Sequence, residues 1–172
     1  VAQKLARRER DLAKLEAKVE RATDTLGRTF ERIVDLLSEM DYVEFEGFGE
    51  DREPVITDEG ERLAKIHSES DLLVAQCLKR GIWNDLDPAE LAGVASLCVF
   101  ENRKATRGEP GAATDPMADA MDATWRIYTE LVADERRHNL PQTREPEPAF
   151  ALAIHQWLSL IHISEPTRLG MI

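Results

Sequence analysis

Residues 81–104, GIWNDLDPAELAGVASLCVFENRK, contain the clearest helix signals in the sequence and decide how the chain folds. Asp87 is a good N-cap residue, Pro88 suits the first helical position, and Glu90 completes a capping box. Apolar residues then recur at helical spacing and are predicted to face the core: Leu91, Val94, Ala95, Leu97 and Cys98. The stretch therefore predicts a well-capped helix with one buried side.

The sequence immediately before this stretch predicts another helix and a small hairpin. Ser68 or Ser70 starts that helix, and its predicted buried residues are Leu72, Leu73, Ala75, Cys77 and Leu78. Residues 42–57 alternate apolar and polar side chains around an acidic, glycine-containing turn, which is typical of two short strands. Thr57 can cap a short helix that reaches Ile66. Because eight acidic residues lie in and after the hairpin, its winged-helix-like outline indicates a structural role rather than DNA reading.

The sequence after this stretch predicts two further helices. A flexible loop covers residues 103–116, and Asp115 with Pro116 repeats the cap-and-proline start for a long helix that ends near His138. One side of this helix is apolar: Met117, Met121, Trp125, Tyr128, Leu131 and Val132. A proline-rich connector then leads to a helix from Pro148 through Trp157.

The first 41 residues are predicted to be helical. Leu5, Leu12, Val19 and Leu26 recur every seven positions and form a heptad-like seam, which is interrupted at Arg8. We therefore expect a helical arm over residues 1–24, followed by an amphipathic helix over residues 25–41. Together these elements predict a mainly α fold, a helical bundle with a small winged-helix-like β-hairpin near residues 42–57.

Composition and charge restrict the possible functions. The chain has 172 residues, 42% hydrophobic and 32% charged, which suits one domain with an appended arm. No apolar run is long enough to cross a membrane, and Cys77 and Cys98 are expected to be buried thiols of a cytoplasmic protein. The net charge is −11, but residues 1–28 carry eight Lys or Arg and five acids. The rest of the chain is therefore strongly acidic and a poor independent RNA binder.

The sequence predicts no catalytic, cofactor-binding or metal-binding residues. It lacks a phosphate-binding loop, a nucleophile elbow and histidines at metal-ligand spacing. Its tryptophans stand at apolar helical positions, which favours core packing over base stacking: Trp83, Trp125 and Trp157. Arg103, Lys104 and Arg107 form the only basic cluster outside the arm, and they are either a phosphate contact or a solvated helix end.

The end of the sequence differs in origin from the rest. Residues 158–168, LSLIHISEPTR, match one reading frame of a transposon-type sequencing-library adapter. We therefore expect residues 158–172 to be a foreign sequence and exclude them from functional inference. The alternative is that the apolar residues in this segment continue the preceding helix. On the first interpretation, the domain over residues 25–157 is truncated.

A family resemblance rests on residues 60–104. Its marks are Gly60 with the following arginine and alanine, the G-x-x-N-x-L-x-P-x-E pattern that begins at Gly81, and the S-x-x-V-F-E pattern that begins at Ser96. The chain thereby resembles the C-terminal DSHCT domain of superkiller and exosome-type DExH RNA helicases. RTFERIVDLLSEMDYVE, residues 28–44, resembles the same segment of the bacterial HelY-type members, and the resemblance covers about residues 20–157.

This resemblance implies a part of a larger enzyme. It implies a helical bundle that braces the ATP-driven motor domains of the same protein and completes the RNA channel of a 3′-to-5′ helicase in RNA processing or decay. ATP and Mg²⁺ would be bound by the parent protein, RNA would be bound through the full-length protein, and a ribonuclease is an expected partner. The arm would be the return from an inserted stalk. The alternative is a stand-alone helical module that binds a partner helix through its heptad seam.

Overall fold

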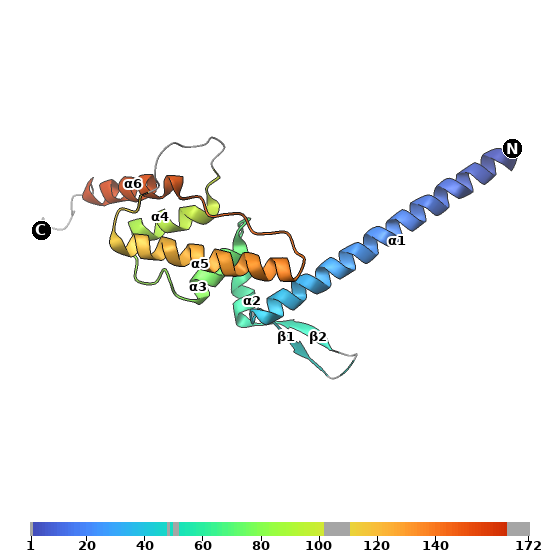
Figure 1. Ribbon diagram of the computed structural model, residues 1–172, viewed down its shortest axis with the longest axis horizontal. Coiled ribbons are helices and arrows are strands. Elements are labelled where there is room, and N and C mark those ends of the chain that lie inside the picture. The colour runs from blue at the N-terminus through green and yellow to red at the C-terminus, as the bar shows by residue number, and fades with distance from the viewer. Residues whose placement is uncertain (1, 48, 50–51, 102–110, 165–172) are drawn as a thin grey trace, which may run out of the picture.

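The computed structural model describes residues 2–47, 49, 52–101 and 111–164. The elements, in chain order, are α1 (Ala2–Glu39), β1 (Val43–Glu46), β2 (Glu53–Ile56), α2 (Asp58–Leu63), α3 (Asp71–Lys79), α4 (Pro88–Val99), α5 (Asp115–Arg137), the 3₁₀ turn η2 (Pro148–Phe150) and α6 (Ala151–Ser164). Figure 1 shows α3 to α6 gathered in a bundle, with α1 projecting far from it and the hairpin at its base. The predicted mainly α class with a small hairpin is confirmed.

The core lies between the four bundle helices. α4 packs against α5 and α6, and α3 packs against α4 and α5. Trp83 lies in the loop that joins α3 to α4 and is buried, and its indole N–H donates to the Thr124 hydroxyl on α5 at 3.1 Å. Gly93 lets α6 approach α4, because a Cβ there would lie 2.9 Å from the Ala151 carbonyl oxygen. The other fully buried core side chains include Leu73, Cys77, Val94, Leu97, Cys98, Met117 and Leu131.

The predicted start of α4 is confirmed in detail. The Asp87 carboxylate accepts from the backbone N–H groups of Ala89 and Glu90, and the Glu90 carboxylate accepts from the Asp87 N–H at 2.9 Å. Glu90 also accepts from the Thr114 hydroxyl at 2.5 Å. The predicted start of α5 was one residue late: Thr114 rather than Asp115 is the N-cap, and its hydroxyl accepts from the Met117 N–H.

Several sequence-based boundaries and burial assignments were wrong. α1 runs through residue 24 without a break, so the predicted arm and the predicted helix after it are continuous, while the domain boundary at residue 24 stays a prediction. α2 ends at Leu63 rather than near Ile66. Leu78 and Leu91, both expected to be buried, are 52% and 38% exposed, because each lies at the edge of its helix's buried stripe. α6 continues past Trp157 through Ser164, while the foreign origin of residues 158–172 stays a prediction.

The hairpin is antiparallel and pairs Val43 with Ile56 and Glu46 with Glu53. Gly47 and Gly49 in its turn have positive φ angles, which glycine adopts without strain. Val43 is buried, whereas all four residues of β2 are exposed. The hairpin is therefore covered on one strand only.

Candidate functional site

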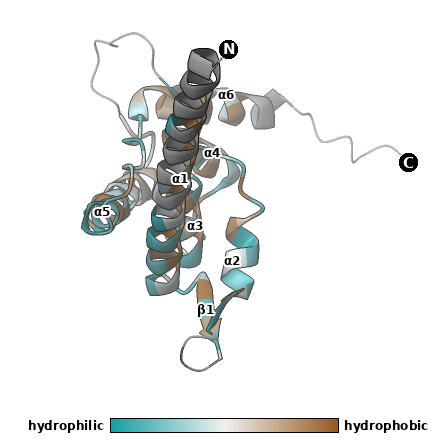
Figure 2. Ribbon diagram, turned by 90° about the vertical axis from the view of Figure 1, so that its right-hand side faces the viewer, coloured by the Kyte–Doolittle hydropathy of each residue, from teal (hydrophilic) through white to brown (hydrophobic). Residues whose placement is uncertain are grey.

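The apolar seam of α1 is exposed. Leucine, valine, isoleucine and phenylalanine side chains follow one another at heptad spacing on one side of this helix. They are 41% to 71% exposed, and we call them the apolar face of α1: Leu12, Leu15, Val19, Leu26, Phe30 and Ile33. Figure 2 shows further apolar residues on the hairpin below it, where Val55 and Ile56 are 39% and 63% exposed. Contiguous exposed apolar side chains of this size mark interaction surfaces.

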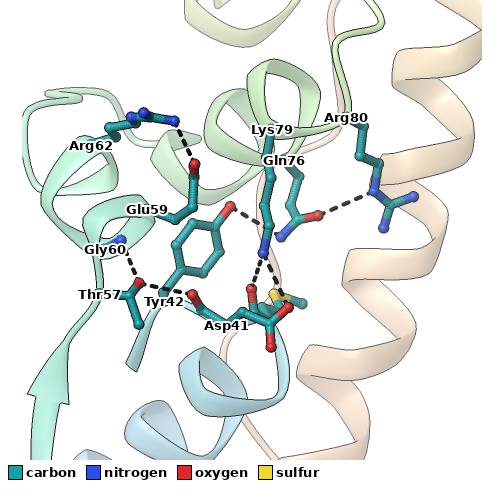
Figure 3. Close-up of polar contacts among 10 residues, drawn as sticks. Asp41, Tyr42, Thr57, Glu59, Gly60, Arg62, Gln76, Lys79 and Arg80 are labelled. Carbon is teal, nitrogen blue, oxygen red and sulfur yellow. Dashed lines mark hydrogen bonds and ion pairs between the residues drawn. The ribbon is translucent and has the colours of Figure 1, made fainter. Parts of the chain in front are cut away.

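A buried polar junction fixes the base of α1 to the bundle (Figure 3). Tyr42 is 1% exposed, and its hydroxyl accepts from the Gln76 amide at 3.1 Å. Gln76 in turn accepts from Arg80 at 3.2 Å. Burial raises the pKa of Tyr42 to about 12, so the phenol stays protonated. The junction is therefore hydrogen-bonded and continuous from Tyr42, at the start of the hairpin, to α3.

A left-handed residue and three further hydrogen bonds shape this junction. Asp41 has a φ of 60°, a left-handed conformation that turns the chain from α1 into β1. Thr57 donates to the Asp41 carbonyl at 2.9 Å and caps α2 through the Gly60 N–H at 3.1 Å. Lys79 donates to the Met40 carbonyl at 2.6 Å from the α3 side. Residues at the end of α1, the end of β2 and the end of α3 thus meet at one point.

An ion-pair cluster attaches α1 to the bundle at a second place, the C-terminal end of α5. Arg137 contacts Glu39 through two nitrogens, at 2.7 and 3.2 Å, and Asp134 at 2.8 Å. His138 Nε2 lies 3.1 Å from the same Glu39 carboxylate. The hydrogen bond from Arg137 is the main reason that the pKa of Glu39 is lowered, and the pKa of Arg137 is raised in return. Because these groups face water, the cluster orients α1 more than it stabilises the fold.

A groove of about 380 Å³ lies beside the C-terminal end of α4. Phe100 stacks on Phe150 with ring centroids 4.8 Å apart, and Trp125 packs edge-on against Tyr128 at 5.7 Å. The connector between α5 and η2 forms the opposite wall. The groove is lined by Phe100, Glu101, Trp125, Arg144, Glu145, Pro146, Glu147 and Pro148. We call it the aromatic groove.

The predicted phosphate contacts, Arg103, Lys104 and Arg107, lie outside the described residues. Of the tryptophans predicted to be in the core, Trp83 is buried, Trp125 is half-buried at the aromatic groove, and Trp157 is 63% exposed. The charged residues that line the aromatic groove, Arg144, Glu145 and Glu147, lie in a segment predicted only as a proline-rich connector, and no sequence motif indicated a groove there. Among the residues that the structure describes, no group of three potential metal ligands occurs and no helix is long and apolar enough to cross a membrane.

Comparison with known proteins identifies relatives. Residues 53–167 match the family model of the DSHCT (NUC185) domain. The chain is 46% identical over 160 residues to "Probable helicase HelY" of Mycobacterium tuberculosis (strain ATCC 25618 / H37Rv) and 43% identical over 164 residues to "Probable helicase HelY" of Mycobacterium leprae (strain TN). Each alignment covers 91% of this chain and 17% of the relative. The chain therefore spans about 17% of the length of these curated relatives.

Proposed function

Because the chain belongs to the DSHCT (NUC185) domain family, we propose that it is the C-terminal helical region of an ATP-dependent 3′-to-5′ RNA helicase of the HelY type. In this proposal the bundle braces the motor domains of a longer parent protein and completes its RNA channel. ATP and Mg²⁺ belong to the motor, the protein works in the cytoplasm in RNA processing or decay, and a ribonuclease acts with it.

The exposed apolar face of α1 carries this proposal. Leu26, Phe30 and Ile33 are separated by four and three positions, so they share one side of the helix, and they are 71%, 62% and 41% exposed. Each large apolar side chain that becomes buried contributes roughly 1.5 to 3 kcal/mol. We infer that this side of α1 packs on the rest of the parent protein. The two attachments at Tyr42 and Glu39 hold α1 in a fixed direction for that purpose.

The negative charge of the chain favours a role as a brace for the motor domains over independent RNA binding. The net charge is −11; residues 1–28 carry eight basic and five acidic side chains, a sum of +3, so the residues after them sum to −14. Phosphate groups are repelled by such a surface unless basic side chains are concentrated on one side. We therefore expect the chain alone to bind single-stranded RNA weakly and to hydrolyse no ATP.

The test uses the full-length parent with charged residues placed on the apolar face. Phe30→Glu together with Ile33→Glu should abolish RNA unwinding, because two charges would be buried in the proposed contact. Glu31→Gln together with Arg32→Gln is the matched control, since both side chains are exposed on the same turn. The control should unwind RNA normally. Normal unwinding by the double-glutamate variant would contradict the proposal.

The same seam also supports the alternative, a stand-alone module that binds a partner helix. The two functions separate when residues 1–172 are mixed with the parent protein that lacks them. Sedimentation as a single complex, with restored unwinding, supports the helicase brace. Failure to associate with the parent would favour the stand-alone module.

A further inference from the structure

The aromatic groove has the chemistry of a site for a positively charged side chain. Trp125 is half-buried, so part of its ring faces the groove, and Phe100 is held beside it by stacking on Phe150 at 4.8 Å. Aromatic rings attract a cation that lies over their faces, and they also cover the apolar stem of arginine. The volume of about 380 Å³ falls within the range of sites that bury a small ligand or one long side chain.

The charges around the groove select a cation over an anion. Glutamates at positions 101, 145 and 147 line it, and among the lining residues that the structure describes Arg144 is the one basic side chain. Arg144 donates to the Cys98 carbonyl at 3.2 Å, and its charge is partly offset by Glu69, which lies 3.9 Å away. The groove therefore repels phosphate, and single-stranded nucleic acid does not fit it despite the aromatic rings.

Glu145 is the acid best placed to meet a ligand. It is exposed, and within the described part of the chain it makes no hydrogen bond or ion pair. Burial raises the pKa of Tyr128, whose ring packs against Trp125, and the nearby negative charge of Glu145 raises it further. Glu147 differs, since its carboxylate accepts from the Ala149 N–H at 3.0 Å and holds the start of η2.

The connector wall is rigid enough to present these groups. Glu135, 5% exposed on α5, accepts from the Thr143 N–H at 2.7 Å and the Thr143 hydroxyl at 2.5 Å. At the other end, the Glu147 N–H donates to the Leu97 carbonyl at 2.9 Å. Pro146 between them is buried. A wall fixed at both ends loses little conformational entropy when a ligand binds.

We propose that the aromatic groove docks an arginine-containing segment of a separate protein. The guanidinium pairs with Glu145 while its stem and plane lie on Trp125 and Phe100. Arginine suits this site better than lysine, because its planar, weakly hydrated head stacks on aromatic rings. Figures 1 and 2 both place α4 and α6 at the end of the bundle away from the hairpin. The described residues that line the groove come from α4, α5, η2 and the segments around them, and none comes from α1 or the hairpin, so a separate protein can occupy the groove while the apolar face of α1 is covered.

Binding is measured by fluorescence anisotropy with residues 1–172 and three labelled peptides of one length, rich in arginine, lysine or glutamate. We expect the arginine peptide to bind most tightly, the lysine peptide more weakly and the glutamate peptide not at all. Glu145→Lys should weaken arginine-peptide binding by roughly fivefold or more, as expected for reversal of a charge that faces the ligand. Glu44→Lys, an equal charge change on the exposed face of the hairpin, is the matched control and should bind as the wild type does.

A second readout reports on the ring itself. Binding should change the tryptophan fluorescence of the wild type, and Trp125→Phe should keep the affinity within about threefold, a difference of roughly 0.6 kcal/mol, while losing that fluorescence change. Three results would overturn the proposal: equal binding of the glutamate peptide, unchanged binding by Glu145→Lys, or preferential binding of a single-stranded RNA oligonucleotide that Glu145→Lys strengthens.

The full-length parent shows whether the arginine-containing segment comes from a separate protein or from the parent's own chain. If the groove serves a separate protein, the parent and residues 1–172 bind the arginine peptide equally well. Binding by residues 1–172 but not by the parent would show that the parent's own chain fills the groove, which refutes an outside partner. This outcome is independent of the unwinding test above, since the apolar face of α1 and the groove are changed by different substitutions.

Discussion

Replacing Glu90 with alanine should destabilise the bundle more than any other single change at a helix end. Glu90 is 6% exposed, and its two oxygens join two helices. One accepts from the Asp87 N–H at 2.9 Å at the start of α4, and the other accepts from the Thr114 hydroxyl at 2.5 Å at the start of α5. The substitution removes both bonds together.

The magnitude follows from the surroundings of the two bonds. A hydrogen bond to a charged group contributes roughly 1.5 to 3 kcal/mol. Asp87 is exposed and Thr114 is only partly buried, so water can partly replace both lost bonds, and the lower value applies to each. We expect a total loss of about 3 kcal/mol of unfolding free energy, a large part of the roughly 5 to 15 kcal/mol typical of a domain. The midpoint of thermal unfolding should fall by roughly 6 to 12 °C.

Urea unfolding followed by circular dichroism measures this loss. Glu90→Gln keeps one carbonyl acceptor and still suits a capping box, so it should cost only about 1 kcal/mol. Asp122→Ala, an exposed acid on α5, is the control and should change stability by less than about 0.5 kcal/mol. The reasoning is refuted if Glu90→Ala unfolds at the same urea concentration as the wild type, or if Glu90→Gln is equally damaging.

Three further predictions concern the junction and the core. Gly60→Ala should cost about 2 kcal/mol or more in urea unfolding, because its Cβ would overlap the backbone oxygen that precedes the hairpin, whereas Gly27→Ala, with open space around it, should be neutral or stabilising. Burial raises the pKa of Cys77 to about 12 and that of Cys98 to about 11, so the native thiols should resist a thiol-reactive dye until the protein unfolds. The stability that these buried thiols contribute is complete below their ordinary pKa of 9.0 and is lost as the pH rises through their folded pKa values. Replacing both cysteines with alanine should abolish this loss of stability at high pH. The pKa of Glu39 is lowered by its arginine partner, so its contribution is present above the ordinary value of 4.5 and is lost as the pH falls through the folded pKa. Glu39→Gln should remove that acid dependence from unfolding curves; an unchanged acid limb would show that the ion pair does not form in solution.

The start of α4 could be predicted from local sequence alone. The capping box at Asp87 was predicted because all of its partners lie within four residues, and the structure contains each of those bonds. The cap of α5 was predicted one residue late. The capping bond of Thr114 is local, since the donor is the Met117 N–H, but Asp115 and Pro116 repeat the Asp-Pro pattern that starts α4 and drew the prediction one residue too far. The second bond of Thr114, to Glu90, joins residues 24 positions apart and is set by packing.

Burial at the edge of a helix face also required the tertiary structure. Leu78 and Leu91 have the spacing of core residues, yet they are 52% and 38% exposed. Trp157 also differs from Trp83, since only Trp83 finds a hydrogen-bond partner, Thr124, inside the bundle. Periodicity identifies the side of a helix that could be buried, and packing decides which part of that side is buried.

Local backbone preferences and motifs within residues 60–104 were enough to predict the mainly α class, the small hairpin, the start of α4 and the DSHCT family. Only the tertiary structure showed that α1 is one helix with an exposed apolar face and that the connector forms the charged wall of an aromatic groove. Those features arise from side chains far apart in the chain. Phe100 and Glu145 meet because Glu135 and Leu97 hold the connector across α4 and α5, and no local pattern encodes that contact.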